Sequence, residues 1–488
     1  MLEILKTSLG SYLPEVVCVV LMCALLIAES MHKEEGGDRI IVHWIATLGL
    51  GVATFFAASG LGAAPVTAFY DAVMIDGFSG VIKILMLVAT IGTIWLSRSS
   101  NDIYPTLKSE FVIMAVGTLI GGMLLASANN MLTLYLGIET LSILSYVMTS
   151  LKREDSTSTE AGMKYALYGG LTAGVMLFGM SHIYGLLGSI QFTEIVPKIA
   201  LLQGGDLAFL LVSFLLFFVG LGYKVSAFPF HMWSPDVYQG APIPVTAFFA
   251  LVPKMAGMAV LLRVSHLFFA DDSVAGMAWV GLLHVVAALT MTVGNVTAIG
   301  QDSVKRLLAF SSIGHVGMML MGVVVLDVVG VRAIVFYGIT YVFMTLVAFW
   351  VTSALNDAYG TDSQAVFKGL IKRHPVMAIS MVITLFSLAG LPPFSGFVAK
   401  FNILSAVVEK GYFGLAFIAA VNSVIGLYYY MKLAKEMIFA DSDSTEAMSS
   451  FTDTVKVSVV ALTIPVVLLG VFWESAMSFA GAAIIHLR

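Results

Sequence analysis

The chain has 488 residues, of which 59% are hydrophobic and only 11% are charged, and its formal net charge is −5. Its mean hydropathy of +0.95 excludes a soluble domain of this length. The composition therefore predicts an all-α polytopic membrane protein. The small net charge and the limited soluble surface give no reason to expect nucleic-acid binding.

About fourteen segments are apolar over the roughly 20 residues that a membrane-spanning helix needs. Their centres lie near residues 20, 50, 86, 118, 140, 173, 217, 256, 286, 315, 343, 388, 426 and 464. These segments divide the chain into an N-terminal set of helices one to three (1–109), two blocks of five helices (110–269 and 275–439), and a last helix with a tail (440–488).

The distribution of lysine and arginine predicts the orientation. Fifteen basic residues follow odd-numbered segments: Lys33, Arg39, Arg98, Lys108, Lys152, Arg153, Lys164, Lys305, Arg306, Lys368, Lys372, Arg373, Lys432, Lys435 and Lys456. Five lie on the opposite side: Lys6, Lys198, Arg332, Lys410 and Arg488. By the positive-inside rule the odd loops are cytoplasmic and both termini lie outside.

Five basic residues remain within membrane segments: Lys83, Lys224, Lys254, Arg263 and Lys400. Lys83 lies near the start of the third segment, so we expect it to snorkel to the interface. We expect Arg263, near a helix end, to be structural. A charge near the bilayer centre costs about 2.5–3.5 kcal/mol, so the three deeper lysines need a protein interior or a wet cavity.

The two five-helix blocks predict an inverted repeat. Because five is odd, tandem copies would insert with opposite orientation, as in many transporters. Proline interrupts the fourth helix of each block, at Pro229 and at Pro392-Pro393, and each interruption has a lysine nearby, Lys224 and Lys400. Proline removes a backbone hydrogen bond, so we expect the seventh and twelfth helices to be discontinuous at mid-depth.

The fifth segment carries Glu139 close to its centre, deeper than the other acids of the chain, which we place at segment ends. An ionised carboxylate at that depth needs a partner, and otherwise it holds a proton. Lys224 belongs to the same block and is the expected partner. The pair is either a proton-carrying element or a structural salt bridge.

Lys254 lies in the middle of the eighth segment with no acid nearby in sequence. A buried amine without a counter-charge exchanges its proton near neutral pH, so Lys254 is a candidate relay group. His231 and His315 titrate near physiological pH and would extend the line, or they are hydrogen-bonded packing residues. No CxxC, His cluster or other metal spacing is found, so no cofactor or metal is expected on this chain.

Three runs carry a resemblance to a known family: KVSAFPFHMWSPDVYQGAPIPVTAFFALVPK, QDSVKRLLAFSSIGHVG and SLAGLPPFSGFVAKF. They resemble the antiporter-like membrane subunits of respiratory complex I and the related Mrp-type cation/proton antiporters. PDVYQGAPIPV and the lysine at position 400 are most similar to the N-type branch of that family, from bacterial NADH–quinone oxidoreductase.

The resemblance implies a proton channel in the membrane arm of a redox-driven pump. Its relay would consist of Glu139, Lys224, Lys254 and Lys400. NADH, FMN, iron–sulfur clusters and quinone would belong to other subunits, and neighbouring membrane-arm subunits and lipid would be the partners. The implied location is the bacterial inner membrane. Alternatives are a cation/proton antiporter subunit, for which Na⁺ or K⁺ should alter activity, and the equivalent subunit of a membrane-bound hydrogenase-type complex.

Overall fold

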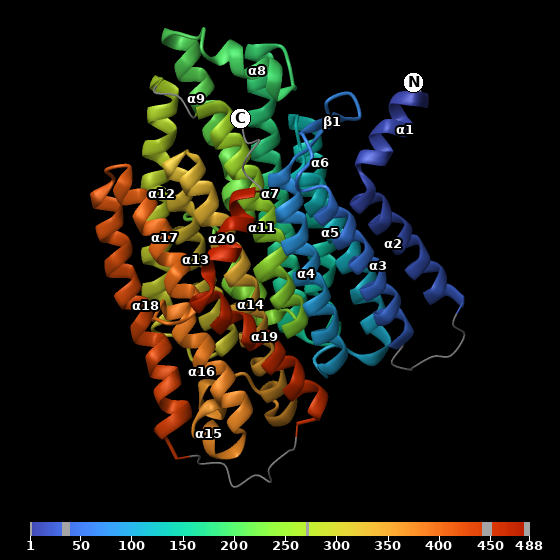
Figure 1. Cartoon of the computed structure of the whole chain (residues 1–488), viewed down its shortest axis with the longest axis vertical. Helices are drawn as coiled ribbons and strands as arrows, with labels where there is room; N and C mark the ends of the chain where they lie inside the picture. Colours follow the sequence, from blue (N-terminus) through green and yellow to red (C-terminus); the bar gives the residue numbers. More distant parts are fainter. Residues whose placement is uncertain (1, 32–39, 270–272, 442–450, 483–488) are drawn as a thin grey trace.

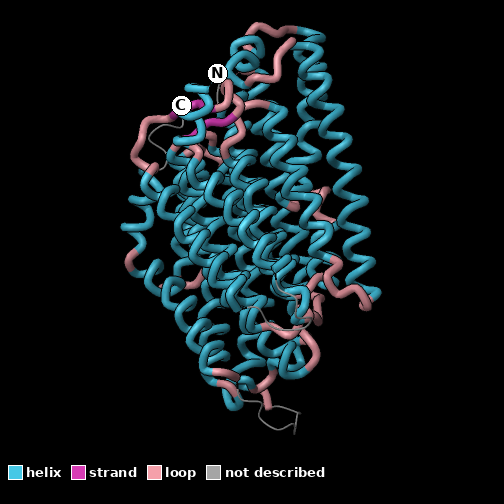
Figure 2. The backbone as a smooth tube through the Cα atoms, turned by 90° about the vertical axis from the view of Figure 1, so that its right-hand side faces the viewer, coloured by secondary structure: helices cyan, strands magenta, loops and turns pink. Residues whose placement is uncertain are grey.

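The computed structural model describes residues 2–31, 40–269, 273–441 and 451–482. Most helices run along the long axis of an elongated bundle (Figure 1), and loops gather toward its two ends (Figure 2). Thirteen helices among the described residues are long and apolar enough to cross a membrane. The predicted all-α polytopic fold is confirmed.

The N-terminal elements form one side of the bundle (Figure 1). They are α1 (Leu2–Ser11), α2 (Leu13–Met31), α3 (Ile40–Ser59), β1 (Val66–Ala68), β2 (Val73–Ile75) and α4 (Gly77–Ser99). The two strands form a short antiparallel hairpin that pairs Val66 with Ile75. Asp76 ends the hairpin and caps α4, because its carboxylate accepts the backbone N–H of Ser79 at 2.8 Å.

The first predicted block contains η1 (Pro105–Leu107), α5 (Lys108–Ala126), α6 (Met131–Thr149), α7 (Ser156–Leu187), α8 (Phe192–Ile199), α9 (Gly204–Val225), α10 (Trp233–Gly240) and α11 (Ile243–Phe269). The second contains α12 (Val274–Ala298), α13 (Val304–Val325), α14 (Val328–Tyr359), η2 (Gln364–Phe367), α15 (Leu370–Arg373), α16 (Pro375–Ala389), α17 (Ser395–Glu409) and α18 (Phe413–Phe439). The chain continues through α19 (Asp453–Val471) and α20 (Trp473–Ala482).

The seventh and twelfth predicted spans are both discontinuous, as expected. The seventh is α9 followed by a separate short helix, α10. The twelfth is divided into α16 and α17, each of 15 residues, which is too short for either to cross a bilayer alone. The thirteen long helices and this divided span together correspond to the fourteen predicted segments.

The centre of the bundle is formed by α11, α13 and α14. The apolar windows of α11 and α13 are 100% buried and that of α14 is 94% buried, whereas α2 and α19 are only 28% and 17% buried. The peripheral helices therefore present apolar side chains to lipid, while the central helices have no lipid-facing side. Membrane segments whose whole circumference is enclosed by protein are where charged side chains are tolerated.

Candidate functional site

Both helix interruptions begin at a residue in the left-handed conformation. Ser226 ends α9 with φ of 61°, and Gly390 ends α16 with φ of 86°. The peptide bonds Phe228-Pro229 and Pro392-Pro393 in these interruptions are both cis. The backbone is therefore non-helical at two places inside the bundle, and each place lies next to one of the predicted lysines.

Lys224 lies in the last turn of α9 and is 1% exposed. Its Nζ donates to Ser142 Oγ on α6 at 2.9 Å. The expected partner, Glu139, interacts with Lys224 through its charge but forms no direct ion pair with it among the described residues, and Glu139 Oε1 is buried there without a hydrogen-bond partner. Ser142 follows Glu139 by three residues, so the lysine is held one helical turn from the carboxylate, close enough for the two charges to interact.

Lys254 is fully buried in α11. Its Nζ donates to Ser312 Oγ on α13 at 2.5 Å, and the same oxygen accepts the Tyr341 hydroxyl of α14 at 2.7 Å. The Tyr238 ring of α10 lies 5.2 Å from the Lys254 Nζ. The ammonium is therefore stabilised by a hydroxyl and an aromatic face and by no carboxylate among the described residues.

His315 is enclosed between two tyrosines. Its Nδ1 lies 2.5 Å from the Tyr337 hydroxyl and its Nε2 lies 3.1 Å from the Tyr430 hydroxyl, which also contacts Ser311 Oγ. One ring nitrogen of a neutral imidazole donates and the other accepts, so either tautomer satisfies this arrangement. The side chain can therefore exchange a proton with hydroxyls on both of its edges.

Lys400 lies in α17, beyond the second interruption. Its Nζ donates to the Ala389 carbonyl at the end of α16 at 2.9 Å, which uses a carbonyl that the interruption leaves free. Its aliphatic stem crosses Gly390 so closely that a Cβ at that position would lie 2.8 Å from Lys400 Cδ. Lys400 and His315 line one narrow polar cavity.

Apart from Gly314 and the apolar Met318, the remaining residues of the cavity wall carry polar groups. These residues are Asn295, Ser311, Asn422, Ser423, Tyr429 and Tyr430. Tyr429 donates to Asn295 Oδ1 at 3.0 Å, which links α18 to α12. Amide and hydroxyl groups that both donate and accept hydrogen bonds are suited to hold water between His315 and Lys400.

These groups form a sequence across the bundle. The Cβ and Cγ of Lys224 lie beside Gly257, one helical turn from Lys254 on α11. Ser312, which binds Lys254, lies one turn from His315 on α13, and the charges of both Lys254 and Lys400 act on His315. The order from α6 to α17 is therefore Glu139, Lys224, Lys254, His315, Lys400.

His231 is not brought into this line. It lies half-buried in the interruption after α9, and its ring stacks on Phe228 with centroids 5.6 Å apart. Its Nδ1 has no hydrogen-bond partner in the part of the chain that the structure describes. Of the six candidate residues, the structure thus places five along one line and leaves His231 beside it.

Sequence reasoning missed the hydroxyl groups that hold the charges: Ser142, Ser312, Tyr337, Tyr341 and Tyr430. Two of them had a detectable signal. Ser142 and Ser312 are each three residues from a candidate on the same helix, and this spacing places side chains on one face. The tyrosines come from other helices, so only the folded arrangement reveals them.

The expected role of Lys83 is also wrong. Lys83 is 2% exposed, and its Nζ lies 2.6 Å from Glu15 Oε1 on α2, which is also 2% exposed. Glu15 lies in the first turn of α2, at the segment end where it was expected, but its pairing with Lys83 buries it there. Arg263 is structural, as expected, because it holds Asp76 with two hydrogen bonds of 2.9 and 3.1 Å.

A many-spanning helical bundle with two interrupted helices and a line of buried lysines defines a transporter-like membrane protein. The family model described as NADH:quinone oxidoreductase/Mrp antiporter, TM matches residues 128–426. The chain belongs to this family.

Relatives cover nearly the whole chain. It is 38% identical over 507 aligned residues to NADH-quinone oxidoreductase subunit N 2 of Sorangium cellulosum, covering 99% of this chain and 98% of the relative. It is 37% identical to NADH-quinone oxidoreductase subunit N of Rhodospirillum rubrum, over 98% of this chain and 95% of the relative. A chain of respiratory complex I from Thermus thermophilus superposes with a TM-score of 0.81 at 30% identity, covering 96% and 99% of the two chains.

Proposed function

We propose that this chain is the N-type, proton-translocating membrane-arm subunit of an NADH:quinone oxidoreductase, and that Glu139, Lys224, Lys254, His315 and Lys400 carry the protons. One observation supports this most strongly. Three lysines in the interior bind only hydroxyl or carbonyl oxygens among the described residues. Each lysine costs about 2.5–3.5 kcal/mol to bury, and a purely structural role would not offset that free energy.

The contacts favour proton transfer along the line. A lysine that donates to a hydroxyl can lose a proton through that hydroxyl, which then gives up its own proton onward. Between Lys254 and Lys400 the steps would pass through Ser312, the hydroxyls around His315 and the polar cavity. If the Lys224 side chain moved toward Glu139, the carboxylate would stabilise the ammonium form of Lys224. If it moved toward Lys254, Lys224 would release its proton.

The coupling to electron transfer would come from neighbouring subunits of the membrane arm. NADH oxidation, FMN, the iron–sulfur clusters and the quinone would belong to other subunits, and a rearrangement there would alter the position of Lys224 relative to Glu139. Such coupling requires only that two arrangements of the pair differ in proton affinity. We place the chain in the bacterial inner membrane with both termini on the periplasmic side.

The two blocks, 110–269 and 275–439, would be inverted repeats. The interruption in the fourth helix of each block supports this proposal, since both begin at a left-handed residue and both lie beside a relay lysine. The N-terminal helices (1–109) and the C-terminal segment (440–488) would lie outside the repeats. A cation/proton antiporter is less compatible with the site, because several deep ammonium groups repel a metal cation.

The experiment is the Lys224→Ala substitution in the host membrane, with assembly, quinone reductase rate and proton uptake into inverted vesicles measured together. We expect normal assembly with a joint fall of reductase rate and proton uptake. Lys410→Ala is the matched control, because Lys410 is 44% exposed and lies 3.9 Å from Asp327 at the surface.

Wild-type uptake in the Lys224→Ala complex would refute the relay. Uptake that depends on Na⁺ in the wild-type complex would instead favour the antiporter function.

A further inference from the structure

Lys305 is buried although its sequence position predicts a cytoplasmic loop. It is the second residue of α13 and is 7% exposed. Its Nζ donates to the Ala241 carbonyl at 3.1 Å, at the end of α10. A backbone carbonyl is a weak partner for a buried cation, so this lysine, like the relay lysines, lies in the interior without a direct ion pair among the described residues.

Acidic groups surround Lys305 without forming an ion pair with it in the described structure. Asp102 is paired with Lys152 and also accepts the Ile243 backbone N–H at 2.7 Å. Asp362 accepts the backbone N–H of Lys305 at 3.2 Å, and the charges of both acids act on the Lys305 amine. The amine is therefore held by a backbone carbonyl in an acidic environment.

The short helix α10 connects this lysine to Lys254. Ala241, which accepts from Lys305, lies one helical turn from Tyr238, whose ring lies 5.2 Å from the Lys254 Nζ. The Tyr238 hydroxyl lies beside Ser312 and Ser234 but has no aligned hydrogen bond among the described residues. A fully buried hydroxyl without a partner carries a free-energy penalty, which calls for an explanation.

Ser312 provides part of that explanation. Its oxygen accepts two hydrogen bonds, from Lys254 and from Tyr341, so both of its acceptor positions are occupied. Its own proton remains to be donated, and the Tyr238 oxygen is a neighbouring acceptor. A small rotation of these hydroxyls completes a path from α10 to Lys254.

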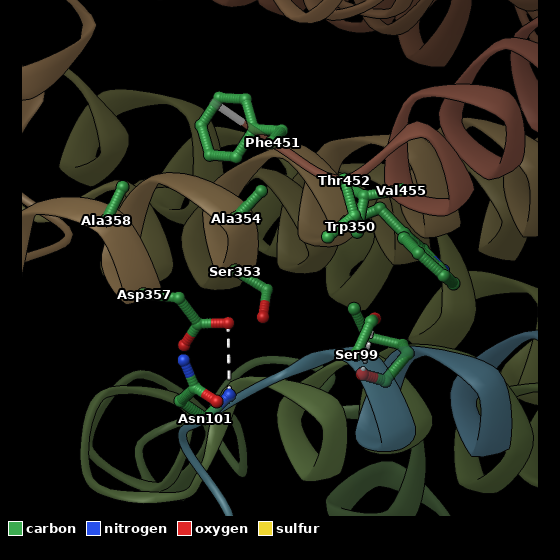
Figure 3. Close-up of a pocket in the computed structure, with 11 residues that line it drawn as sticks. Ser99, Asn101, Trp350, Ser353, Ala354, Asp357, Ala358, Phe451, Thr452 and Val455 are labelled. Carbon is green, nitrogen blue, oxygen red and sulfur yellow. Dashed lines mark hydrogen bonds between the residues drawn. The ribbon is translucent and has the colours of Figure 1, made fainter. Parts of the chain in front are cut away.

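A pocket opens next to this group of residues. Figure 3 shows Asp357 and Ser353 projecting from α14 toward Ser99 and Asn101 at the end of α4. The pocket has a volume of about 200 Å³. Asp357 accepts the Asn101 backbone N–H at 3.0 Å through one oxygen, and its other oxygen is buried without a partner among the described residues.

The pocket wall leads directly to the Lys305 environment. Ser353 donates to Ser100 at 2.9 Å, and the Ser100 oxygen accepts the backbone N–H of Asp102 at 3.1 Å. Asp102, one of the two acids whose charges act on Lys305, therefore directly follows Asn101 of the pocket wall. The charge distribution places this end of the bundle on the cytoplasmic side, where protons would be taken up.

We propose that Lys305 and Tyr238 deliver protons from the Asp357 pocket to Lys254. This inference rests on the proposed function and assigns its uptake side. Neutral Lys305 accepts a proton that enters from the pocket side and becomes an ammonium. It then gives one proton to the Tyr238 oxygen, while the Tyr238 proton passes to Ser312 and the Ser312 proton passes to neutral Lys254. Each hydroxyl gains one proton and loses one.

Tyr238→Phe is the first test, since it removes only the hydroxyl and keeps the ring beside Lys254. Because that hydroxyl makes no aligned hydrogen bond among the described residues, we expect its loss to leave folding and assembly intact. We expect proton uptake into inverted vesicles to fall about tenfold or more. Wild-type uptake in this variant would overturn the proposal.

Lys305→Arg is the second test. Arginine keeps the positive charge and the donors toward Ala241, but it does not release a proton near neutral pH. If Lys305 is only structural, Lys305→Arg should keep near-normal proton uptake. If Lys305 is a relay group, uptake should fall as much in Lys305→Arg as in Lys305→Gln. Lys435→Arg, an exposed position on α18, is the control. If Lys305→Arg does not assemble, Asp357→Asn replaces it, with the same expected fall.

Lys254→Met in the same host separates the two levels of inference. If Lys254→Met abolishes uptake while Tyr238→Phe and Lys305→Arg both keep it, the uptake assignment is wrong and the proposed function stands. If Lys254→Met itself retains wild-type uptake, both are wrong.

Discussion

The buried ion pair between α2 and α4 allows a quantitative prediction. Lys83 and Glu15 are each 2% exposed and lie 2.6 Å apart. Lys83→Met removes one partner and leaves a carboxylate in the interior without its counter-charge. Removing one member of a buried pair costs about 3–5 kcal/mol. This is a large part of the roughly 5–15 kcal/mol that holds a typical domain folded.

Thermal unfolding of the purified complex, followed by intrinsic fluorescence, measures this loss. We expect a clearly lowered transition for Lys83→Met and recovery in the double variant Glu15→Met/Lys83→Met, because a well-packed apolar pair replaces a buried ion pair at little or no cost. Lys456→Met is the matched control. Its partner Asp453 is 96% exposed, and an exposed pair contributes about 0–1 kcal/mol.

A double variant as unstable as Lys83→Met would refute the reasoning, since the loss would then come from packing of the lysine stem. A wild-type transition for Lys83→Met would show that water reaches the pair.

Two further substitutions test other contacts. Gly390→Ala is expected to destabilise by about 1–2 kcal/mol, because alanine is strained at φ of 86° and its Cβ meets Lys400 Cδ. Proton uptake should fall with it, whereas Gly170→Ala, which meets nothing within 4 Å, should leave both unchanged. Asp76→Asn keeps the cap on α4 but leaves Arg263 buried without its counter-charge, so we expect the free energy of unfolding to fall by about 3–5 kcal/mol. An unchanged thermal transition would contradict the exclusion of water from the Asp76–Arg263 pair.

Hydropathy and proline predicted the helices and their interruptions because these depend on local sequence. The third segment, expected around residue 86, is observed as Gly77–Ser99, and the interruptions at Pro229 and Pro392-Pro393 lie where proline removes a backbone hydrogen bond. The burial of Lys254 was also predicted correctly, because this residue lies far from either end of a long apolar run.

The partners of the charges could not be predicted in the same way. Lys224 donates to Ser142 and not to Glu139, although Ser142 and Glu139 lie on the same face of α6. Which of these two side chains the lysine reaches depends on how α6 packs against α9, because they are one helical turn apart. Lys83 and Lys305 lie near segment ends, where sequence cannot distinguish a side chain that reaches solvent from one covered by a neighbouring helix. Burial of such residues is decided by tertiary packing.

The complete enclosure of α11 also constrains how the protein is made. When α11 leaves the ribosome, Tyr238 has already been synthesised, but Ser312 and Tyr341, which form the hydrogen-bonded support of Lys254, lie 58 and 87 residues further along the chain. The helix therefore enters the bilayer with an unsupported charge and reaches its final surroundings only after α13 and α14 have been inserted. Biogenesis must tolerate this interval, so a chain truncated before α14 should be a preferred substrate for membrane quality control.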